Sequence, residues 1–304
     1  MNILWIKDNN VGHEKQVKVL LDELEKNQDI NIDERSVKGF FPFFKYLDRV
    51  SENYYDVLIG AGHKTYSFLL DIKKYQKPET KTIAILTPSF SKPNFDIICA
   101  PSHDKDKHTN LNNVITFEGS LAKVSLIQPD ENIVMIAVGG KNKHYSFDNN
   151  HILSQINYFL SIHPNKKCYI FNSRRTPVLM NNQLKLLAVK DNNINFCDVS
   201  NTSVSFENIL HKSSSKLITR DSVNMIFESL SCKGNTYLID MKHKKTKNKI
   251  VKLVNELISN KKIGYINCEA IIEGISKMKL CKQNTYNDVF AEVEKVSYQL
   301  NKLL

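Results

Sequence analysis

Short, almost continuously apolar runs alternate along the first half of the chain with stretches whose apolar residues recur at helical spacing. Each run has the length of a strand, and the first is followed by apolar residues at positions i, i+3, i+4 and i+7. That stripe is Val17, Leu20, Leu21 and Leu24, and the predicted strands are residues 2–7, 55–60, 82–87, 95–100 and 114–117. Strands that are apolar on both faces need cover on both sides, which predicts a parallel sheet between helices.

The same alternation restarts after a polar junction at residues 128–131. Predicted strands are 132–140, 168–172, 194–197, 216–219 and 236–240, with helices near 148–162, after 172 and from Ser222. Two successive series of this kind predict two Rossmann-like domains, at residues 1–128 and 129–283. Residues 284–304 form a predicted terminal helix, packed either on its own domain or back on the first one. Its apolar face contains Val289, Val293, Val296, Leu300 and Leu303.

The composition is that of a folded globular protein, with 41% hydrophobic and 24% charged residues among 304. No apolar run approaches the roughly 20 residues that span a bilayer. The first residues lack the basic start and the cleavage site of a signal peptide, so we expect a cytoplasmic protein. The six cysteines are scattered without a CxxC pair, which favours neither a disulfide framework nor a zinc site.

The chain is basic, with a formal net charge of +10, and three explanations stay open. The abundance of lysine and asparagine is typical of an AT-rich genome. Alternatively, the charge attracts an anionic membrane surface or a phosphorylated substrate. Nucleic acid is the least favoured partner, because no helix-turn-helix or aromatic-rich RNA motif accompanies the charge. A basic run at residues 241–249 is either solvated surface or a contact for phosphate or lipid head groups.

Ligands of open parallel sheets bind at the carboxyl ends of the strands, so residues at strand ends carry the candidate chemistry. Residues 218–240 are typical of a strand, turn, helix, turn and strand. Asp221 or Ser222 can cap this helix, whose first N–H groups and positive dipole end would favour a phosphate. Glu228, nearly two turns further along, interrupts an apolar neighbourhood. It either grips the diol of a ribose or reaches solvent at the edge of the helix.

Two further strand ends in the second half offer contacts for an anion. Residues 171–177 contain Arg174 and Arg175, whose forked donors suit phosphate oxygens but equally form surface ion pairs. Residues 137–147 contain Gly139 and Gly140, which permit close approach of a ligand to the backbone or simply serve a turn. This segment has neither the GxGxxG fingerprint nor the GxxxxGK(S/T) of a P-loop, which disfavours kinase and dinucleotide-binding functions.

Histidines follow three predicted strands of the first half. His13, after Gly12 at the mouth of the sheet, could act as a general base in its neutral form. Residues 61–65 and 100–104 also place polar side chains at strand ends, namely His63, Lys64, His103 and Asp104. Each histidine by itself could be structural, but three at the strand ends of one half favour a function. No HExxH-like spacing supports a metal site, and we expect none.

Several of these segments resemble, in the same order, the motifs of one family. ITRDSVNMIFESL resembles the TADSVSMVSEA segment of the bacterial and plant family named after a mitochondrial fission, or "elongated mitochondria", protein. NSRRTP, AVGGKNKHYSF, DNNVGHEKQ, AGHKT and APSHD resemble that family's TSRRTP, strand-end glycine loop, DGKPGHENQ, AGRRT and APEHD. The matches span residues 3–240 and are similar to the bacterial branch. Departures are Asn9, Asn10 and Val11 for Gly-Lys-Pro, His63 and Lys64 for Arg-Arg, and Ser102 for glutamate.

The resemblance implies a glycosyltransferase-B-like fold of two Rossmann-like domains facing across a cleft. In that fold the C-terminal domain holds a nucleotide sugar: the turn before one helix contacts the diphosphate, and a glutamate two turns on holds the ribose. The implied donor-binding residues are Gly139, Gly140, Lys141, Ser173, Arg174, Arg175, Thr176, Thr219, Asp221, Ser222, Met225 and Glu228. The implied acceptor-side residues are Gly12, Gly62, His63, Lys64, Thr65, His103 and Asp104.

The leading hypothesis is a metal-independent glycosyltransferase that moves a sugar from a nucleotide-sugar donor to a cell-envelope glycan or lipid-linked acceptor. His13 or Asp8 would deprotonate the acceptor, while arginines and a helix dipole neutralise the leaving phosphate, so no cofactor is expected. The basic surface would hold the protein at the inner face of the cytoplasmic membrane. The alternatives are a nucleotide-sugar 2-epimerase and a non-catalytic, membrane-associated binding protein of the same fold.

Overall fold

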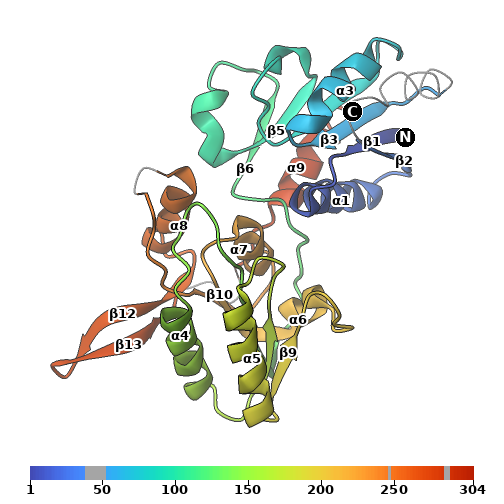
Figure 1. Cartoon of the computed structure of the whole chain (residues 1–304). Helices are drawn as coiled ribbons and strands as arrows, with labels where there is room; N and C mark the ends of the chain where they lie inside the picture. The colour runs from blue at the N-terminus through green and yellow to red at the C-terminus, as the bar shows by residue number, and fades with distance from the viewer. Residues whose placement is uncertain (38–52, 246–247, 284–287) are drawn as a thin grey trace. The chain divides into compact units, whose positions relative to one another are not determined.

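The chain divides into two compact units, each built around its own sheet (Figure 1). The computed structural model describes residues 1–37, 53–245, 248–283 and 288–304. Unit 1 comprises residues 1–123 together with 291–304, and unit 2 comprises residues 124–290. The chain therefore leaves unit 1, builds unit 2 and returns to complete unit 1 with its last residues.

Unit 1 contains a six-stranded sheet in the order β2-β1-β3-β4-β5-β6, and every neighbouring pair is parallel. The strands are β1 (Asn2–Lys7), β2 (Asn31–Ser36), β3 (Val57–Ala61), β4 (Lys81–Ile85), β5 (Ile97–Pro101) and β6 (Val114–Phe117). The helices are α1 (Val11–Glu25), α3 (His63–Lys73) and α9 (Glu292–Leu300), with short 3-10 helices η1 (Lys92–Asn94) and η2 (Ser102–Lys107). The order β2-β1-β3-β4-β5 is that of a doubly wound fold, with its topological switch between β1 and β3.

Burial explains why the apolar pattern identifies most of these strands. β3 and β5 are buried along their whole length, as the continuous apolar runs predict. β2 is the exception, because its sequence NIDERS is polar and it lies at the edge of the sheet with half-exposed side chains. An edge strand is held largely by its backbone pairing with one neighbour, here β1, so it carries no apolar signature.

Unit 2 contains a seven-stranded sheet in the order β13-β12-β11-β10-β7-β8-β9. The strands are β7 (Asp130–Ala137), β8 (Lys167–Phe171), β9 (Ile194–Cys197), β10 (Ser213–Ile218), β11 (Asn235–Leu238), β12 (Gly264–Ile272) and β13 (Ile275–Cys281). The helices are α4 (Asn149–Ser161), α5 (Val178–Lys190), α6 (Phe206–Lys212), α7 (Val223–Leu230) and α8 (Lys249–Ser259). All neighbouring strands are parallel except β12 and β13, which form an antiparallel hairpin (Figure 1).

Two apolar clusters cover the two faces of this second sheet. Val134 and Ile136 belong to the cluster that includes residues of α4 and α5, whereas Met135 and Ala137 belong to the cluster that includes residues of α6, α7 and α8. Alternate residues of one strand thus pack on opposite faces, and both faces are apolar. The predicted α/β class, with two sheets covered by helices, is confirmed.

Several expectations at the C-terminal end need correction. No strand or helix was predicted at α8, β12 and β13. The terminal helix begins only at Glu292, so Val289 lies before it, and Leu303 lies after it with an exposed side chain. The buried face of α9 consists of Val293, Val296, Ser297 and Leu300. Residues 284–287 of the predicted helix lie outside the described residues.

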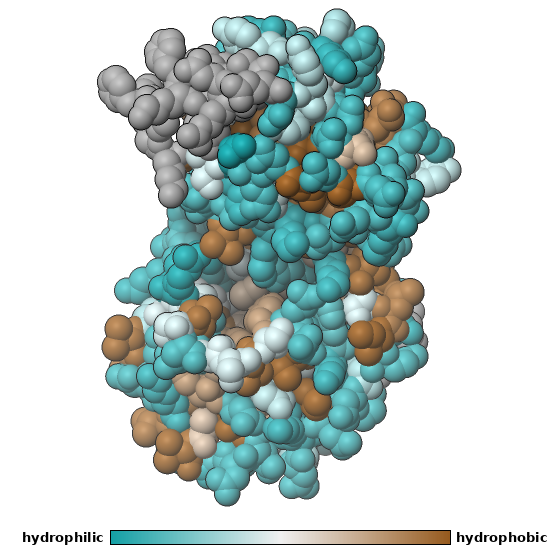
Figure 2. All heavy atoms as spheres, turned by 90° about the vertical axis from the view of Figure 1, so that its right-hand side faces the viewer, coloured by the Kyte–Doolittle hydropathy of each residue, from teal (hydrophilic) through white to brown (hydrophobic). Residues whose placement is uncertain are grey.

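The surface of the described residues is polar with scattered apolar groups. Figure 2 shows one face of the molecule, where hydrophilic side chains predominate and hydrophobic ones gather in separate groups. Within the basic run at 241–249, Lys242 to Lys245 are exposed, Met241 is buried, Lys249 begins α8, and residues 246–247 lie outside the described part. Among the described residues, no helix combines the length and the apolar character needed to cross a membrane.

Candidate functional site

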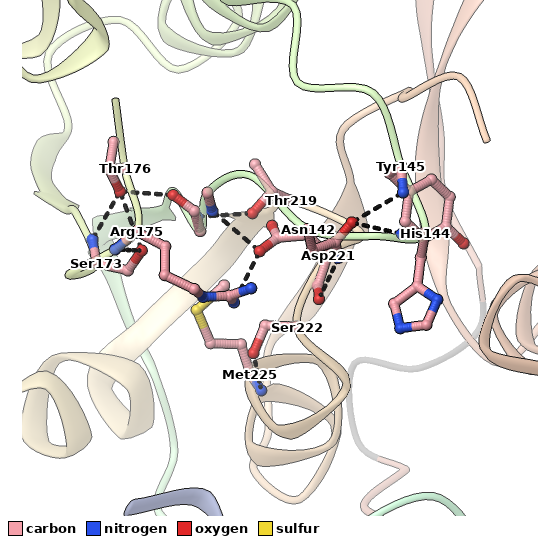
Figure 3. A network of polar contacts seen from close by, with 12 residues as sticks. Asn142, His144, Tyr145, Ser173, Arg175, Thr176, Thr219, Asp221, Ser222 and Met225 are labelled. Carbon is pink, nitrogen blue, oxygen red and sulfur yellow. Dashed lines mark hydrogen bonds and ion pairs between the residues drawn. The ribbon is translucent and has the colours of Figure 1, made fainter. Parts of the chain in front are cut away.

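Three loops of unit 2 meet at the carboxyl edge of its sheet (Figure 3). They follow β7, β8 and β10, which are neighbours in the order β10-β7-β8. The chain runs from β7 outward to β8 and β9, and then returns to the other side of β7 as β10. The switch point therefore lies between β7 and β10, and in doubly wound sheets this is where ligands bind.

Asp221 is the centre of the hydrogen-bond network at this switch point. Its Oδ2 accepts the Gly140 N–H at 2.9 Å and a donor from the Arg175 guanidinium at 3.0 Å. The carboxylate is 1% exposed, whereas the Arg175 side chain is 49% exposed. Charge-assisted bonds of this kind offset the cost of burying a carboxylate. Asp221 thus holds one guanidinium edge of Arg175 and leaves much of that side chain open to solvent.

Gly139 makes room for this carboxylate. A Cβ built on Gly139 would collide with both carboxylate oxygens of Asp221, and one built on Gly140 would collide with the Arg175 backbone. The glycine pair is therefore required for close packing within the protein. The sequence left open whether these glycines admit a ligand or serve a turn. In the structure they make room for the Asp221 carboxylate and the Arg175 backbone.

Two buried threonines lock the same loops together. Thr219 Oγ1 accepts the Gly139 N–H at 2.8 Å. The Thr176 hydroxyl lies 3.0 Å from Val138 O and accepts the Ser173 N–H at 2.8 Å. Both threonine side chains are buried, so their role is to hold the loop backbones in place.

Asn142 is a contact that sequence reasoning missed. Its Nδ2 donates to the Asp221 carbonyl at 2.9 Å, and its Oδ1 accepts the N–H groups of His144 and Tyr145, both at 2.9 Å. Asn142 lies in the loop that follows Gly139 and Gly140. Asparagine side chains commonly hydrogen-bond to nearby backbone groups in such loops. That position was the only signal available in the sequence.

Helix α7 begins beside this network, and Ser222 is its N-cap. The Ser222 hydroxyl accepts the Met225 N–H at 3.5 Å, a long bond, while the Asp221 side chain turns away to the glycine loop. Of the two capping residues that the sequence allowed, the structure selects Ser222. Glu228 lies half-buried on α7 beyond Met225.

Three exposed cations lie on the loops that meet at this edge of the sheet. Lys141, Arg174 and Arg175 are exposed, and all three belong to the loops after β7 and β8. The positive end of a helix dipole adds to their field. This arrangement is chemically suited to bind an anion with several oxygens, such as a phosphate or diphosphate.

Unit 1 carries a second polar cluster at its own switch point, between β1 and β3. His13 Nδ1 lies 2.7 Å from Asp8 Oδ2, and the Asp8 side chain is 6% exposed against 28% for His13. Asp8 follows β1, whereas His13 lies in the first turn of α1. A carboxylate at Nδ1 favours the tautomer with its proton on that nitrogen, which leaves Nε2 as an acceptor.

Helix α1 begins at Val11, so Gly12 and His13 both lie in its first turn. Asn10 caps this helix by accepting the Gly12 N–H at 3.0 Å. Gly62, after β3, has a positive φ of 89°, and a Cβ there would collide with the His13 ring and approach Asp8. Gly12, His13 and Gly62 thus lie together at the mouth of this sheet.

Tyr66 links this cluster to the neighbouring strand and was missed from the sequence. Its hydroxyl accepts the Gly62 N–H at 3.2 Å and donates to the Ile85 carbonyl at 2.8 Å. Burial raises the pKa of Tyr66 well above its usual range, and the carboxylates of Asp8 and Asp104 add to this. A tyrosine in a helical stripe is indistinguishable in sequence from any core aromatic residue.

The other predicted residues of unit 1 lie at the same edge with different surroundings. His63 and Lys64 are exposed at the start of α3, and His63 Nδ1 is 3.2 Å from Ser89 Oγ. Thr65 is buried and bonds the Gly62 carbonyl at 2.9 Å, so it is part of the packing. His103 is half-buried and Asp104 is buried in η2.

Comparison with solved structures identifies the fold. UDP-GlcNAc 2-epimerase from Neisseria meningitidis, bound to UDP-GlcNAc, is 13% identical with a TM-score of 0.53, over 99% of this chain and 100% of that chain. UDP-GlcNAc 2-epimerase from Methanocaldococcus jannaschii is 12% identical with a TM-score of 0.53, over 99% and 100% of the two chains. At this identity the likeness establishes the fold, which is glycosyltransferase-B-like with two Rossmann-like domains. No curated protein matches the chain.

A family match covers nearly the whole sequence. The family described as Mitochondrial fission ELM1 matches residues 11–300, which include every candidate site residue named above except Asp8 and Asn10. This agrees with the motifs from which the resemblance was first inferred. The chain therefore belongs to the mitochondrial fission ELM1 family.

Proposed function

We propose that unit 2 binds a nucleotide sugar, with the diphosphate at the start of α7. The observation that carries this proposal is the meeting of three loops at the β7/β10 switch point, with Arg175 oriented by the buried carboxylate of Asp221. A ligand diphosphate would accept the remaining guanidinium donors of Arg175, and Arg174 and Lys141 would add positive charge. The dipole of α7 favours the same anion.

Glu228 is proposed to hold the ribose of the nucleotide. It is half-buried and lies nearly two turns along α7 from Ser222, so the ribose of a nucleotide bound at the helix start would have to extend along α7 to meet it. A carboxylate can accept two hydrogen bonds from the neighbouring hydroxyls of a ribose. Ser173 and Met225, also half-buried, would line the same region.

The proposed reaction is sugar transfer to a cell-envelope glycan or lipid-linked acceptor. His13 would take the proton of the acceptor hydroxyl on Nε2, because Asp8 holds the other ring nitrogen at 2.7 Å. The imidazolium that forms would be stabilised by the buried Asp8 carboxylate. The arginines and the dipole of α7 would stabilise the leaving phosphate. The surplus of basic residues would favour an anionic membrane surface, where a lipid-linked acceptor resides.

A nucleotide-sugar 2-epimerase is the second candidate function. Two UDP-GlcNAc 2-epimerases share the fold over their full length, which supports this candidate. An epimerase inverts a carbon of the sugar while the nucleotide is present and requires no acceptor. The two candidates therefore predict different products from the same nucleotide sugar.

A thermal-shift panel of UDP-, GDP-, CMP- and dTDP-sugars tests the binding proposal. One member should raise the Tm of the wild type by several degrees, because a ligand that binds only the folded state stabilises it. Arg175→Ala and Glu228→Ala should weaken that binding by about tenfold or more, since each loses a charged contact. Lys185→Ala, an exposed cation on α5 paired only loosely with Asp198 at 3.9 Å, is the matched control. The proposal fails if no nucleotide sugar binds or if the three variants bind alike.

The nucleotide sugar that binds then separates the two reactions. Incubated without acceptor, it should remain unchanged with a transferase and be converted to its 2-epimer by an epimerase. Addition of a membrane extract should consume the donor only in the first case. His13→Gln should abolish that consumption while it leaves donor binding intact, because His13 is proposed to act on the acceptor.

A further inference from the structure

We infer that His151, Asp240 and Cys268 form a binding site for one zinc-like divalent cation in unit 2. One donor atom from each residue lies within 4.8 Å of the other two, and no other group of this kind occurs among the described residues. The set offers imidazole nitrogen, carboxylate oxygen and thiol sulfur, the three ligand types that zinc accepts. The site shares no residue with the proposed nucleotide site.

The distance between two of these ligands fits a shared metal better than a direct bond. His151 Nε2 lies 3.5 Å from Asp240 Oδ2. That exceeds the roughly 2.7–3.2 Å of a good hydrogen bond. Zinc bonds of about 2.0–2.3 Å at tetrahedral angles hold ligand atoms roughly 3.3–3.8 Å apart. The pair therefore already has the spacing of two metal ligands, and the Cys268 Sγ lies within 4.8 Å of a donor atom of each.

Neighbouring groups fix the carboxylate in this orientation. Asp240 Oδ1 is engaged by the Arg220 guanidinium at 3.2 Å, which leaves Oδ2 on the side of His151. Gln155 holds the Asp240 backbone, because it accepts the Asp240 N–H at 2.6 Å and donates to the Asp240 carbonyl at 2.9 Å. Metal-binding carboxylates are commonly oriented by such outer hydrogen bonds. Arg220 also offsets part of the negative charge that a carboxylate and a thiolate bring together.

Cys268 lies at an irregularity in its strand. The pairing of β12 with β13 shifts register between Asn267 and Ala270, which is the position of a β-bulge. A bulge re-aims the side chains of its strand, and bulges occur beside functional sites. His151 comes from the first turn of α4 and Asp240 from the segment after β11, so a bound ion would tie three elements together.

The site is open enough to accept an ion and to retain a solvent ligand. The side chains of His151 and Asp240 are 38% and 39% exposed, and Cys268 is half-buried. Three protein ligands with an open fourth position distinguish catalytic and regulatory zinc sites from closed structural ones. We therefore expect reversible binding with water as the fourth ligand.

Titration of metal-free protein with Co²⁺ and Zn²⁺ tests this inference. Co²⁺ should produce a thiolate-to-cobalt absorption band that saturates at one ion per chain and disappears when Zn²⁺ is added. Zn²⁺ should also raise the Tm by at least about 3 °C, since it binds the folded state. Cys268→Ser and His151→Ala should remove the band and most of the shift in Tm.

Cys281→Ser is the matched control, because Cys281 is also a half-exposed thiol and lies on the paired strand β13. It should retain both signals. Circular dichroism of the metal-free variants establishes that each is folded, and the partial exposure of both mutated side chains favours this. A wild type without the band, or a Cys268→Ser protein that keeps it, would overturn the inference.

Discussion

Two charged side chains in the interior of unit 2 are held by very different partners. Asp221 is 1% exposed and is compensated by the Arg175 guanidinium and by a backbone N–H. Lys216 is fully buried and has no carboxylate partner among the described residues. Its ammonium instead donates to the carbonyls of Ser229 and Lys233 at 2.9 and 2.8 Å. Burial lowers the pKa of Lys216 accordingly. Asp221 thus orients the Arg175 side chain, which reaches solvent, whereas Lys216 holds backbone carbonyls in place.

His163 gives a prediction for the pH dependence of stability. Burial lowers the pKa of His163 below its ordinary value of 6.5, because its ring packs on Phe159 with centroids 4.3 Å apart. The unfolded chain therefore binds a proton more readily than the folded chain. The contribution of neutral His163 to the free energy of unfolding is fully present above about pH 6.5 and is lost as the pH falls through the lowered pKa.

His163→Gln should reduce this loss, since glutamine does not titrate and can still donate to the Phe159 carbonyl, which lies 2.8 Å from the His163 ring. Urea unfolding at about pH 7.5 and about pH 5.5 measures the effect. The difference between the two conditions should be smaller in the variant than in the wild type. His63→Gln, at an exposed position, should keep the wild-type difference. Equal differences in wild type and His163→Gln would refute the assignment.

At the scale of the element, α7 depends on residues outside itself at both ends. Ser222 caps the first turn of α7. The Lys216 ammonium, from β10, donates hydrogen bonds to carbonyls in the last turn of α7 and just beyond it. Carbonyls at the end of a helix have no partner within the helix and need other donors. A buried lysine ammonium supplies three N–H donors. The helix that carries Glu228 is thus fixed to the sheet by a strand residue.

Lys216→Met should lower the free energy of unfolding by about 2–5 kcal/mol, because several buried carbonyls would lose their hydrogen-bond donor. Chemical denaturation measures the change. Lys252→Met on α8, where the lysine side chain is 77% exposed, is the control and should stay within about 0.5 kcal/mol of wild type. A Lys216→Met protein as stable as the control would show that water or rearranged backbone satisfies those carbonyls.

At the scale of the whole molecule, unit 1 is completed by the last residues of the chain. α9 packs against α1 and β6, and the Glu118 N–H donates to the Glu292 carboxylate at 2.6 Å. Val293, Val296 and Leu300 are fully buried there. A segment that follows unit 2 in sequence therefore belongs to the core of unit 1.

Leu300→Ala should destabilise unit 1 by about 2–5 kcal/mol through the cavity that it leaves. Leu303→Ala lies three residues further on at a position 53% exposed, and it should change stability by less than about 0.5 kcal/mol. Hydrogen exchange resolved by peptide measures both variants. Protection should fall in α1 and β6 of Leu300→Ala and stay unchanged in the strands of unit 2. Loss of protection in unit 2 instead would contradict the assignment of α9 to unit 1.

Most of the fold was predictable because burial of parallel strands leaves a strong pattern. β3, β5 and β8 coincide closely with apolar runs, since strands covered on both faces tolerate few polar residues. β2 and the hairpin β12–β13 were missed. β2 and β13 are edge strands, which rest largely on backbone pairing with one neighbour and so carry a weak apolar pattern. The register shift in β12 weakens the pattern of that strand.

The candidate residues were predictable as strand-end residues, but their partners were not. Spacing in the sequence placed Gly139, Arg175 and Asp221 after predicted strands, and in the structure they follow the neighbouring strands β7, β8 and β10. It did not indicate that Asp221 binds Arg175 rather than capping α7. Asn142 and Tyr66 were missed because an asparagine in a loop and a tyrosine in a helix are common without any such role.

The amino-acid sequence by itself determined the α/β class, the two units and the edge of each sheet at which polar residues gather, because these follow from periodicity along the chain. Tertiary structure alone decided which residues meet across that edge and to which unit α9 belongs. It also decided that His151, Asp240 and Cys268 lie close together. Those three lie far apart in the sequence and share no spacing motif. The order of strands in a sheet sets such meetings, and that order is a property of packing between distant segments.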